Sequence, residues 1–249
     1  MSRVLRTGAA FLLFGTISVA LAAVVIPVAR RLSRDLPPDL RAQRVIHRGY
    51  CLFIWYMVKA GVMTLRTEGA DRLKGEGAVL VVANHPTLID MCVLGSIMPQ
   101  VDCIVNVKRA ENPTLRGAVT AAGYVRNDGG AAVVNECAAR LRAGRTVLVF
   151  PEGTRSPRSG LGPFKRGAAH VALRSGHEIL PVLITCDPPT LLKGQKWYDV
   201  PDRSFQVTVR TLDPISPKPY ASSGDSAGLA ARKLTAELRE AFLKRMESG

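Results

Sequence analysis

The chain has 249 residues, 47% of them hydrophobic and 22% charged, which suffices for one sizeable core and an appendage. This composition excludes a disordered chain. The five cysteines form an odd set without a CxxC pair, so they favour neither a disulfide framework nor a zinc site. With 34 Lys and Arg against 20 Asp and Glu, the formal charge is +14, which predicts attraction to nucleic acid, anionic lipid or phosphorylated substrates.

The N-terminal segment carries the strongest membrane signal. Residues Ala9–Val28 contain no charged side chain, and such a run is about long enough to cross a ~30 Å hydrocarbon layer as a helix. A cleaved signal peptide is the alternative, because Arg3 and Arg6 precede the run and Ala20-Leu21-Ala22 resembles a cleavage site. The run continues beyond that site, which favours an anchor or a transmembrane helix.

The charges on either side of this run predict its orientation. Two arginines precede it, whereas a larger set follows it, and the more basic flank usually faces the cytoplasm. We therefore expect the cytoplasmic (inner) membrane as the location, with the globular part on the cytoplasmic side. The basic residues that follow the run are Arg30, Arg31, Arg34, Arg41 and Arg44.

A second apolar stretch, Tyr50–Leu65, is short for a membrane span and has Lys59 within it. It is typical either of a helix in the membrane interface, with Trp55 and Tyr56 at headgroup depth, or of a buried core helix. We predict membrane-associated helices over residues 1–66 and a catalytic domain over residues 67–249.

Beyond Glu68, short β-branched runs alternate with longer helical patterns. This alternation predicts an α/β fold with a mixed, largely parallel central sheet flanked by helices. The expected strands are Ala78–Ala83, Val101–Val107, Thr146–Phe150, Ile179–Ile184 and Phe205–Arg210. The expected helices are Thr87–Met98, Thr114–Ala122, Ala131–Ala143, Phe164–Ser175 and an amphipathic C-terminal helix with apolar residues at steps of four from Ala230 to Met246.

The segment NHPTLID, residues 84–90, follows the first of these strands. Proline is favoured at the first helical position, so we expect the helix to begin at Pro86 and leave His85 outside it. The His85 ring would then fold back toward Asp90, whose carboxylate would hold one ring nitrogen and leave the other as a general base. Alternatively, His85 caps the helix and Asp90 interacts with its positive end.

The segment FPEGTRS, residues 150–156, also follows a strand. Open α/β sheets place ligands beyond the carboxyl ends of their strands, so both segments are expected on one rim. Gly153 permits a close backbone approach, and Arg155 offers a donor fork for a phosphate. Taken alone, this sequence is also that of an ordinary turn.

Together the two segments resemble the first and third signature blocks of the glycerolipid acyltransferases, the family of 1-acylglycerol-3-phosphate acyltransferase. Gly123-Tyr124-Val125-Arg126 resembles the second block and Ile179-Leu180-Pro181-Val182 the fourth, in the family's order. The stretch GPFKRGAA, residues 162–169, resembles the segment between the third and fourth blocks. The resemblance covers about residues 65–215.

The resemblance implies transfer of a fatty acyl group from a thioester, acyl-CoA or acyl-carrier protein, to a hydroxyl of a lysophospholipid. His85 would be the general base and Asp90 its orienting partner. No metal or other cofactor is implied. The substrate-binding residues would be Arg126, Glu152, Gly153, Thr154 and Arg155, with Lys108 or Lys165 as further cations near the phosphate.

Departures from the family pattern concern the acceptor. Pro86 stands where a polar residue is common, and Arg126 lies closer to its glycine than is usual. Lysophosphatidate is therefore the default acceptor, with an amino-acid lipid, a glycolipid or a pigment-like hydroxyl as alternatives.

Two non-catalytic classes are weaker. A membrane lipid-binding protein would not need the His85 and Asp90 pair. Nucleic-acid binding is not expected, because the basic residues are dispersed, aromatic residues make up only 6%, and no recognition motif is present. Membrane lipids and phosphorylated substrates explain the charge better.

Overall fold

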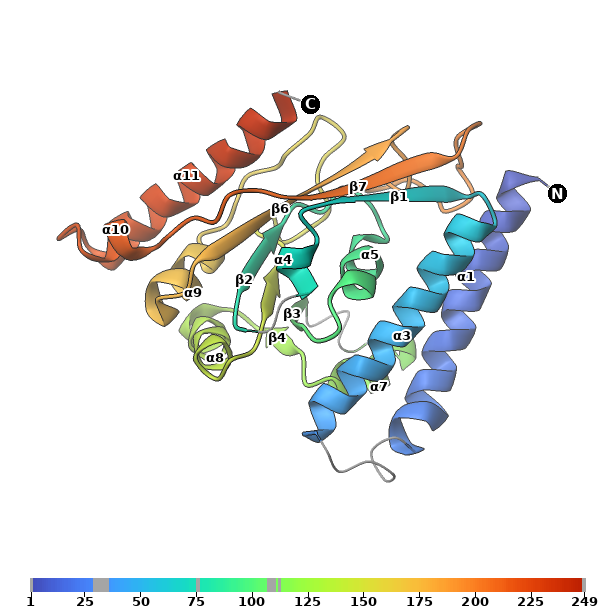
Figure 1. Ribbon diagram of the computed structural model, residues 1–249, viewed down its shortest axis with the longest axis horizontal. Coiled ribbons are helices and arrows are strands. Elements are labelled where there is room, and N and C mark those ends of the chain that lie inside the picture. Colours follow the sequence, from blue (N-terminus) through green and yellow to red (C-terminus); the bar gives the residue numbers. More distant parts are fainter. Residues whose placement is uncertain (1, 29–35, 75–76, 107–110, 112, 248–249) are drawn as a thin grey trace.

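The computed structural model describes residues 2–28, 36–74, 77–106, 111 and 113–247. Its centre is a seven-stranded sheet with the order β1-β7-β6-β2-β5-β3-β4 (Figure 1). All neighbouring strands are parallel except β6 and β7, so the predicted mixed, largely parallel sheet is confirmed. The strands are β1 (Met63–Glu68), β2 (Leu80–Ala83), β3 (Asp102–Asn106), β4 (Val125–Asn127), β5 (Val147–Val149), β6 (Ile179–Asp187) and β7 (Phe205–Thr211).

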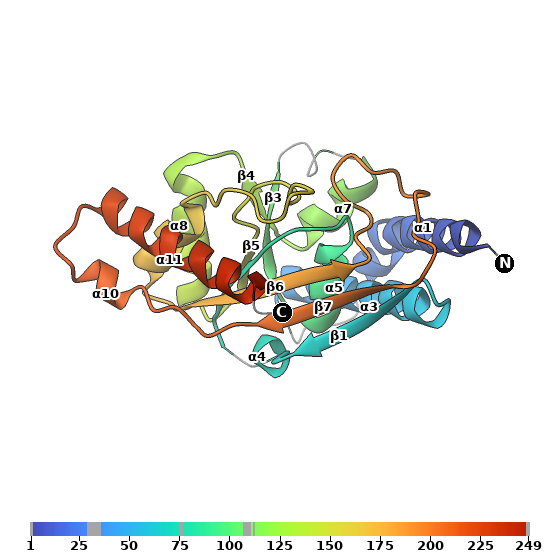
Figure 2. The same cartoon turned by 90° about the horizontal axis from the view of Figure 1, so that it is seen from above.

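Helices cover both faces of the sheet (Figures 1 and 2). One layer contains α1 (Arg3–Ala20), its π-helical continuation η1 (Leu21–Val25), α3 (Pro38–Lys59), α5 (Asp90–Ile97) and α7 (Pro113–Ala121). The other contains α8 (Gly130–Arg142), α9 (Gly167–Ser175) and α11 (Ala227–Glu247). Two short helices, α4 (Asp71–Lys74) and α10 (Lys218–Ala221), lie in connections.

Alternation along the strands divides the core in two. In β2, Val81 packs with Phe53 and Met57 of α3, whereas Leu80 and Val82 pack on the opposite face with α8, α9 and α11. Successive strand residues point to opposite faces, so a strand covered on both sides is apolar throughout. This explains why all four residues of β2 are buried.

Five of the strands were predicted from sequence, but both edge strands were not. Tyr50–Leu65 looked like one apolar stretch, yet the chain leaves α3 after Lys59, turns at Gly61 with a positive φ of 66°, and enters β1. The predicted boundary between residues 66 and 67 therefore falls inside a strand of the sheet. The other edge strand, β4, has only three residues and carries too short a pattern to detect.

The α3 helix, which includes the first part of Tyr50–Leu65, is buried on one side, as the core-helix alternative predicted. Phe53, Ile54 and Met57 are buried against the sheet, whereas Leu52 and Trp55 are exposed. A polar cluster fastens the start of α3 to the body: the Gln43 amide donates to the Asp102 carboxylate at 2.9 Å, and its oxygen accepts from the backbone N–H of Val101. Tertiary contacts therefore join α3 to the sheet.

Candidate active site

Adjacent strands bring the two sequence motifs together. β2 and β5 pair in parallel, with Val82 opposite Val149, so the segments that follow them leave the sheet at the same rim. The Asn84 side chain continues the pairing of β2 with β6 beyond the end of β2. Its Nδ2 donates to the Ile184 carbonyl at 2.9 Å, and its Oδ1 accepts from the Ile184 N–H at 2.7 Å. This side chain anchors the start of the first motif to β6.

The His85 and Asp90 side chains meet as expected, but by a different backbone path. The nitrogen Nδ1 of His85 lies 2.7 Å from Oδ2 of Asp90. The helix that follows begins at Asp90, so the expectation of Pro86 at the first helical position is wrong. Instead, the segment between them turns, and the Asp90 carboxylate accepts hydrogen bonds from the Thr87 N–H at 2.7 Å and the Thr87 hydroxyl at 2.5 Å.

This pair is buried and strongly oriented. Asp90 is fully buried, His85 is 7% exposed, and the Phe150 ring stacks on the imidazole with ring centroids 4.4 Å apart. An ionised carboxylate only accepts hydrogen bonds, so Nδ1 carries the proton and Nε2 is the basic nitrogen. The arrangement can take a proton from a hydroxyl group placed beside Nε2.

Glu152 braces the two motifs against each other. Its Oε1 accepts from the His85 N–H at 3.2 Å and from the Ser156 hydroxyl at 2.6 Å, and its Oε2 accepts from the Gly162 N–H at 2.9 Å. The Glu152 side chain is buried, with 5% of the residue exposed. Its hydrogen bonds thus connect the backbone on either side of the site.

A cavity of about 650 Å³ opens beside His85. Apolar side chains from several elements form most of its wall, as in pockets that enclose hydrophobic ligands. Tyr50 and Tyr124 are also part of the wall, and burial raises the pKa of both phenols far above the ordinary value, so both remain neutral. The apolar wall includes Ile46, Met91, Ile104, Val105, Val119, Val133, Val134 and Val149.

The predicted substrate-binding residues divide into two groups: Gly153 and Thr154 are part of the described cavity wall, whereas Arg126, Glu152 and Arg155 are not. Gly153 and Thr154 line the cavity together with Lys165, whose Nζ would lie 2.8 Å from a side chain added at Gly153. Arg126 lies on β4, and its Nη2 is 3.5 Å from a carboxylate oxygen of Glu111. Lys108 is outside the described residues.

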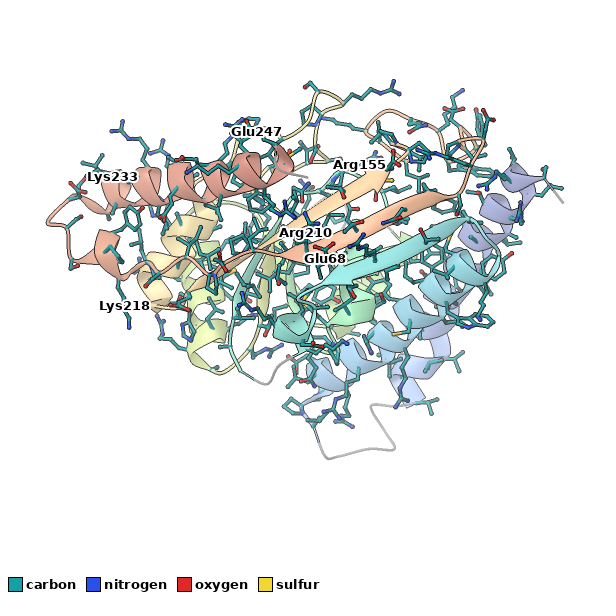
Figure 3. All side chains as sticks on the ribbon, turned by 45° about the horizontal axis from the view of Figure 1, so that its top comes forward. Glu68, Arg155, Arg210, Lys218, Lys233 and Glu247 are labelled. Atoms are coloured by element: carbon teal, nitrogen blue, oxygen red, sulfur yellow. The ribbon has the colours of Figure 1, made fainter. Side chains whose placement is uncertain are left out.

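Arg155 reaches the loop that follows β6. Its Nη1 donates to the carbonyls of Leu191 and Leu192 at 3.1 and 2.9 Å. Figure 3 shows Arg155 beside the loop end of β6. The Leu191 carbonyl also accepts from the backbone N–H of Leu88, so Arg155 helps to hold this loop against the turn between His85 and Asp90.

Residues that sequence reasoning did not single out complete the site. Asn84 fastens the start of the first motif to β6, and Thr87, Phe150 and Ser156 contact the His85 and Asp90 pair or its backbone. The first two belong to the NHPTLID segment and the others to FPEGTRS, so the motifs contained the signal. Their contacts depend on side-chain directions that spacing does not define.

Two cysteines near Asp90, Cys92 and Cys186, are unsuited to nucleophilic chemistry. Burial raises the pKa of the Cys92 thiol to about 12 and that of Cys186 to about 11. Because the thiolate is the nucleophile, neutral thiols of this kind are unreactive. Within the described residues no cluster of three or more His, Cys, Asp or Glu side chains could hold a metal ion.

The site is an oriented histidine beside an apolar cavity, at the rim of an α/β fold. The Acyltransferase family model matches residues 64–185, which include both motifs. The chain belongs to the glycerolipid acyltransferase family, as its resemblance to the signature blocks predicted.

Individual proteins agree with this assignment. The acl-2 protein of Caenorhabditis elegans is 30% identical over 178 residues, covering 67% of this chain and 60% of that one. The 1-acyl-sn-glycerol-3-phosphate acyltransferase alpha of Mus musculus is 29% identical over 162 residues, 61% of this chain and 55% of that one. The present chain thus aligns with less than two-thirds of the length of either relative.

The fold is shared with a solved structure. The 1-acyl-sn-glycerophosphate acyltransferase PlsC from Thermotoga maritima superposes with a TM-score of 0.68 at 22% identity. The match covers 96% of this chain and 97% of that one, so the similarity includes the N-terminal helices as well as the sheet.

Proposed function

We propose that this protein is an O-acyltransferase that moves a fatty acyl group from a thioester, acyl-CoA or acyl-carrier protein, to a hydroxyl of a lysophospholipid such as 1-acylglycerol-3-phosphate. The observation that carries the proposal is the 2.7 Å contact between His85 and Asp90 beside an apolar cavity. The mouse protein and the Thermotoga protein, which are named as acyltransferases of 1-acylglycerol-3-phosphate, support the reaction class and the acceptor.

The chemical step follows from the orientation of the histidine. As the acceptor hydroxyl oxygen bonds to the thioester carbonyl carbon, Nε2 of His85 takes the hydroxyl proton and Asp90 stabilises the resulting imidazolium. The tetrahedral intermediate then collapses, the carbon–sulfur bond breaks, and the proton passes from Nε2 to the departing thiolate. The products are an ester and a thiol, and no covalent enzyme intermediate is required.

Charge around the cavity supports a phosphorylated acceptor. The Lys165 ammonium lies against Gly153, on the same cavity wall as His85. A cation there would bind a phosphate through charge-assisted hydrogen bonds. From the family resemblance we extend the phosphate-binding role to Arg126 and Arg155, with Thr154 as a further donor.

Membrane attachment through the N-terminal helix is part of the proposal. The helical stretch Arg3–Val28 is long and apolar enough to cross a membrane, and only 17% of its most apolar window is buried. On this stretch Leu5, Leu12, Val19, Val24 and Val25 are exposed, and apolar surface of this extent requires a cover that the described residues do not provide. We place the body on the cytoplasmic side, where the basic residues on both flanks of the helix would meet the anionic headgroups of that leaflet.

Contacts at both ends of this helix favour a position along the membrane surface. Near its start, Gly8 packs against Trp197 of the body, and near its end Ala22 packs against Gly117 of α7. These contacts lie roughly 20 Å apart along the helix axis. A helix crossing the bilayer would carry one of them into or through the hydrocarbon layer, so we propose that α1 enters one leaflet.

The decisive experiment replaces the proposed base. His85→Ala should abolish acyl transfer from acyl-CoA and acyl-carrier protein to lysophosphatidate, while circular dichroism and membrane association remain those of the wild type. His177→Ala is the matched control, because that half-buried ring hydrogen-bonds within its own turn, to the Ser175 carbonyl, and does not line the cavity. Transfer by His85→Ala at a near wild-type rate would refute the proposed mechanism.

A further inference from the structure

The connection between β6 and β7, residues 188–204, forms an ordered loop. The Gln195 side chain accepts from the Leu192 N–H at 3.1 Å and donates to the Asp199 carbonyl at 2.9 Å. The Asp199 carboxylate in turn accepts from the Lys196 N–H at 3.2 Å. These bonds give the loop a defined tip, which carries Trp197 and Tyr198.

This tip packs against the apolar N-terminal helix. The Trp197 ring lies 6.2 Å from that of Phe11, centroid to centroid, and a side chain added at Gly8 would lie 3.2 Å from it. Figures 1 and 2 both place the loop beside the N-terminal half of α1. The loop tip therefore continues the surface of the helix that we propose to enter the membrane.

The tip leaves aromatic surface uncovered. Trp197 and Tyr198 are each 44% exposed, although their rings pack edge to face at 5.5 Å. On α1, Leu5 and Leu12 are 61% and 72% exposed. Apolar surface of this kind on an ordered loop marks an interaction site rather than a face that stays in water.

The chemistry of the tip fits a lipid surface. Indole and phenol rings favour the boundary between hydrocarbon and headgroups, because each has an apolar body and a polar atom. Lys193 and Lys196 are exposed on the same loop, and the Lys196 ammonium lies 5.3 Å from the Tyr198 ring centroid. Across the loop, Lys193, Lys196 and Arg203 outnumber Asp199 and Asp202, and this net positive charge suits anionic headgroups.

We propose that the tip of the β6–β7 loop is a second membrane contact, with Trp197 and Tyr198 at headgroup depth in an anionic bilayer and both lysines among the headgroups. The inference rests on the proposed attachment of α1 to the membrane. The proposed loop contact is separate from that of α1, because the loop connects two strands of the central sheet.

The base of this loop connects the membrane contact to the active site. The Leu191 carbonyl accepts from both Arg155 and the backbone N–H of Leu88, which lies in the turn between His85 and Asp90. The loop would thus hold the catalytic turn at a defined position relative to the lipid surface. Arg155 acts in this respect as a positioning residue.

Tryptophan fluorescence tests the contact directly, because the chain has only two tryptophans, Trp55 and Trp197. Trp55→Phe leaves Trp197 as the single reporter in the full-length protein, reconstituted into phosphatidylcholine and phosphatidylglycerol vesicles. We expect lipid brominated near the glycerol backbone to quench Trp197 more strongly than lipid brominated near the chain end. Vesicles should also protect it from acrylamide.

The complementary variant separates the two proposals. In Trp197→Phe the remaining tryptophan is Trp55, which is 56% exposed on α3. Co-sedimentation with vesicles shows whether the protein is attached to the membrane at all. If the protein sediments but Trp197 is not quenched by brominated lipid, the loop proposal is overturned and attachment through α1 stands. Protection from acrylamide without bromine quenching would instead indicate that a second copy of this chain covers the loop, which also overturns the proposal.

A partition measurement adds a second readout. Replacing both Trp197 and Tyr198 by Ser should lower vesicle partition by about tenfold, since each ring loses apolar area from the interface. Met246→Ser is the matched control, because this exposed side chain lies on α11, at the other end of the chain. Equal partition of the double variant and the control would overturn the proposal.

Discussion

The backbone N–H of Ser156 donates a 2.7 Å hydrogen bond to the carbonyl of His85. These residues stand in different motifs, 71 positions apart. The Glu152 carboxylate reinforces the connection by accepting from His85 and Ser156 at once. Consequently the general base is positioned by the second motif as well as by Asp90.

The Asp90 carboxylate should be needed for the rate more than for binding. In Asp90→Asn the neutral amide cannot stabilise the imidazolium or enforce the proton on Nδ1 of His85. We expect kcat to fall by roughly 10² to 10⁴, the usual contribution of a positioned base, with a small change in the KM of either substrate. Steady-state kinetics checks this, and a kcat within a few-fold of the wild type would contradict it.

Glu152 should matter for stability because it accepts three buried or partly buried hydrogen bonds. Glu152→Ala leaves the donors of His85, Ser156 and Gly162 without this acceptor, and an unsatisfied buried group costs about 1 to 3 kcal/mol. We expect the free energy of unfolding to fall by about 3 kcal/mol in denaturant titrations. Glu152→Gln, which keeps one oxygen, should lose less. A stable Glu152→Ala variant with a raised acceptor KM would indicate substrate contact instead.

Lys165 should recognise the phosphate of the acceptor. Lys165→Met removes the cation from the cavity wall, and a hydrogen bond to a charged group contributes about 1.5 to 3 kcal/mol. We expect the KM for lysophosphatidate to rise by about tenfold or more, with the thioester KM unchanged. Arg166→Met, which alters the exposed neighbour outside the cavity lining, is the control. An equal rise for a monoacylglycerol lacking phosphate would exclude this role.

The ion pair between Asp39 and Arg145 should make the docking of α3 dependent on pH. Burial raises the pKa of Asp39, but the 2.6 Å hydrogen bond and the charge of Arg145 outweigh it, so the pKa lies below its usual 3.8. A lowered folded pKa stabilises the protein above the unfolded pKa and ceases to do so as the pH falls through the folded value.

The test compares the wild type with Asp39→Asn by denaturant unfolding across the pH range. At neutral pH we expect the wild type to be more stable by up to about 1 kcal/mol, because the pair is partly exposed. The difference should close in strong acid. A difference that stays constant down to low pH would show that the Asp39 charge has no part in it.

The sequence by itself determined the elements whose patterns are local. Short β-branched apolar runs located β2, β3, β5, β6 and β7, and the polar segments at the ends of β2 and β5 marked the site, because both signals are properties of neighbouring residues. The family resemblance then supplied the reaction class. The apolar N-terminal helix was equally visible, since an uncharged apolar run is a property of one continuous stretch of sequence.

Only the tertiary structure decided which of these pieces meet. The pairing of β2 with β5, and hence the hydrogen bond from Ser156 to His85, depends on a sheet order that joins residues far apart in the chain. Likewise, the turn before Asp90, the brace at Glu152 and the reach of Arg155 toward Leu191 result from side-chain directions in a packed interior. Spacing along a chain defines neither the order of strands nor the direction of a buried side chain, because both are set by the simultaneous packing of all the elements around them.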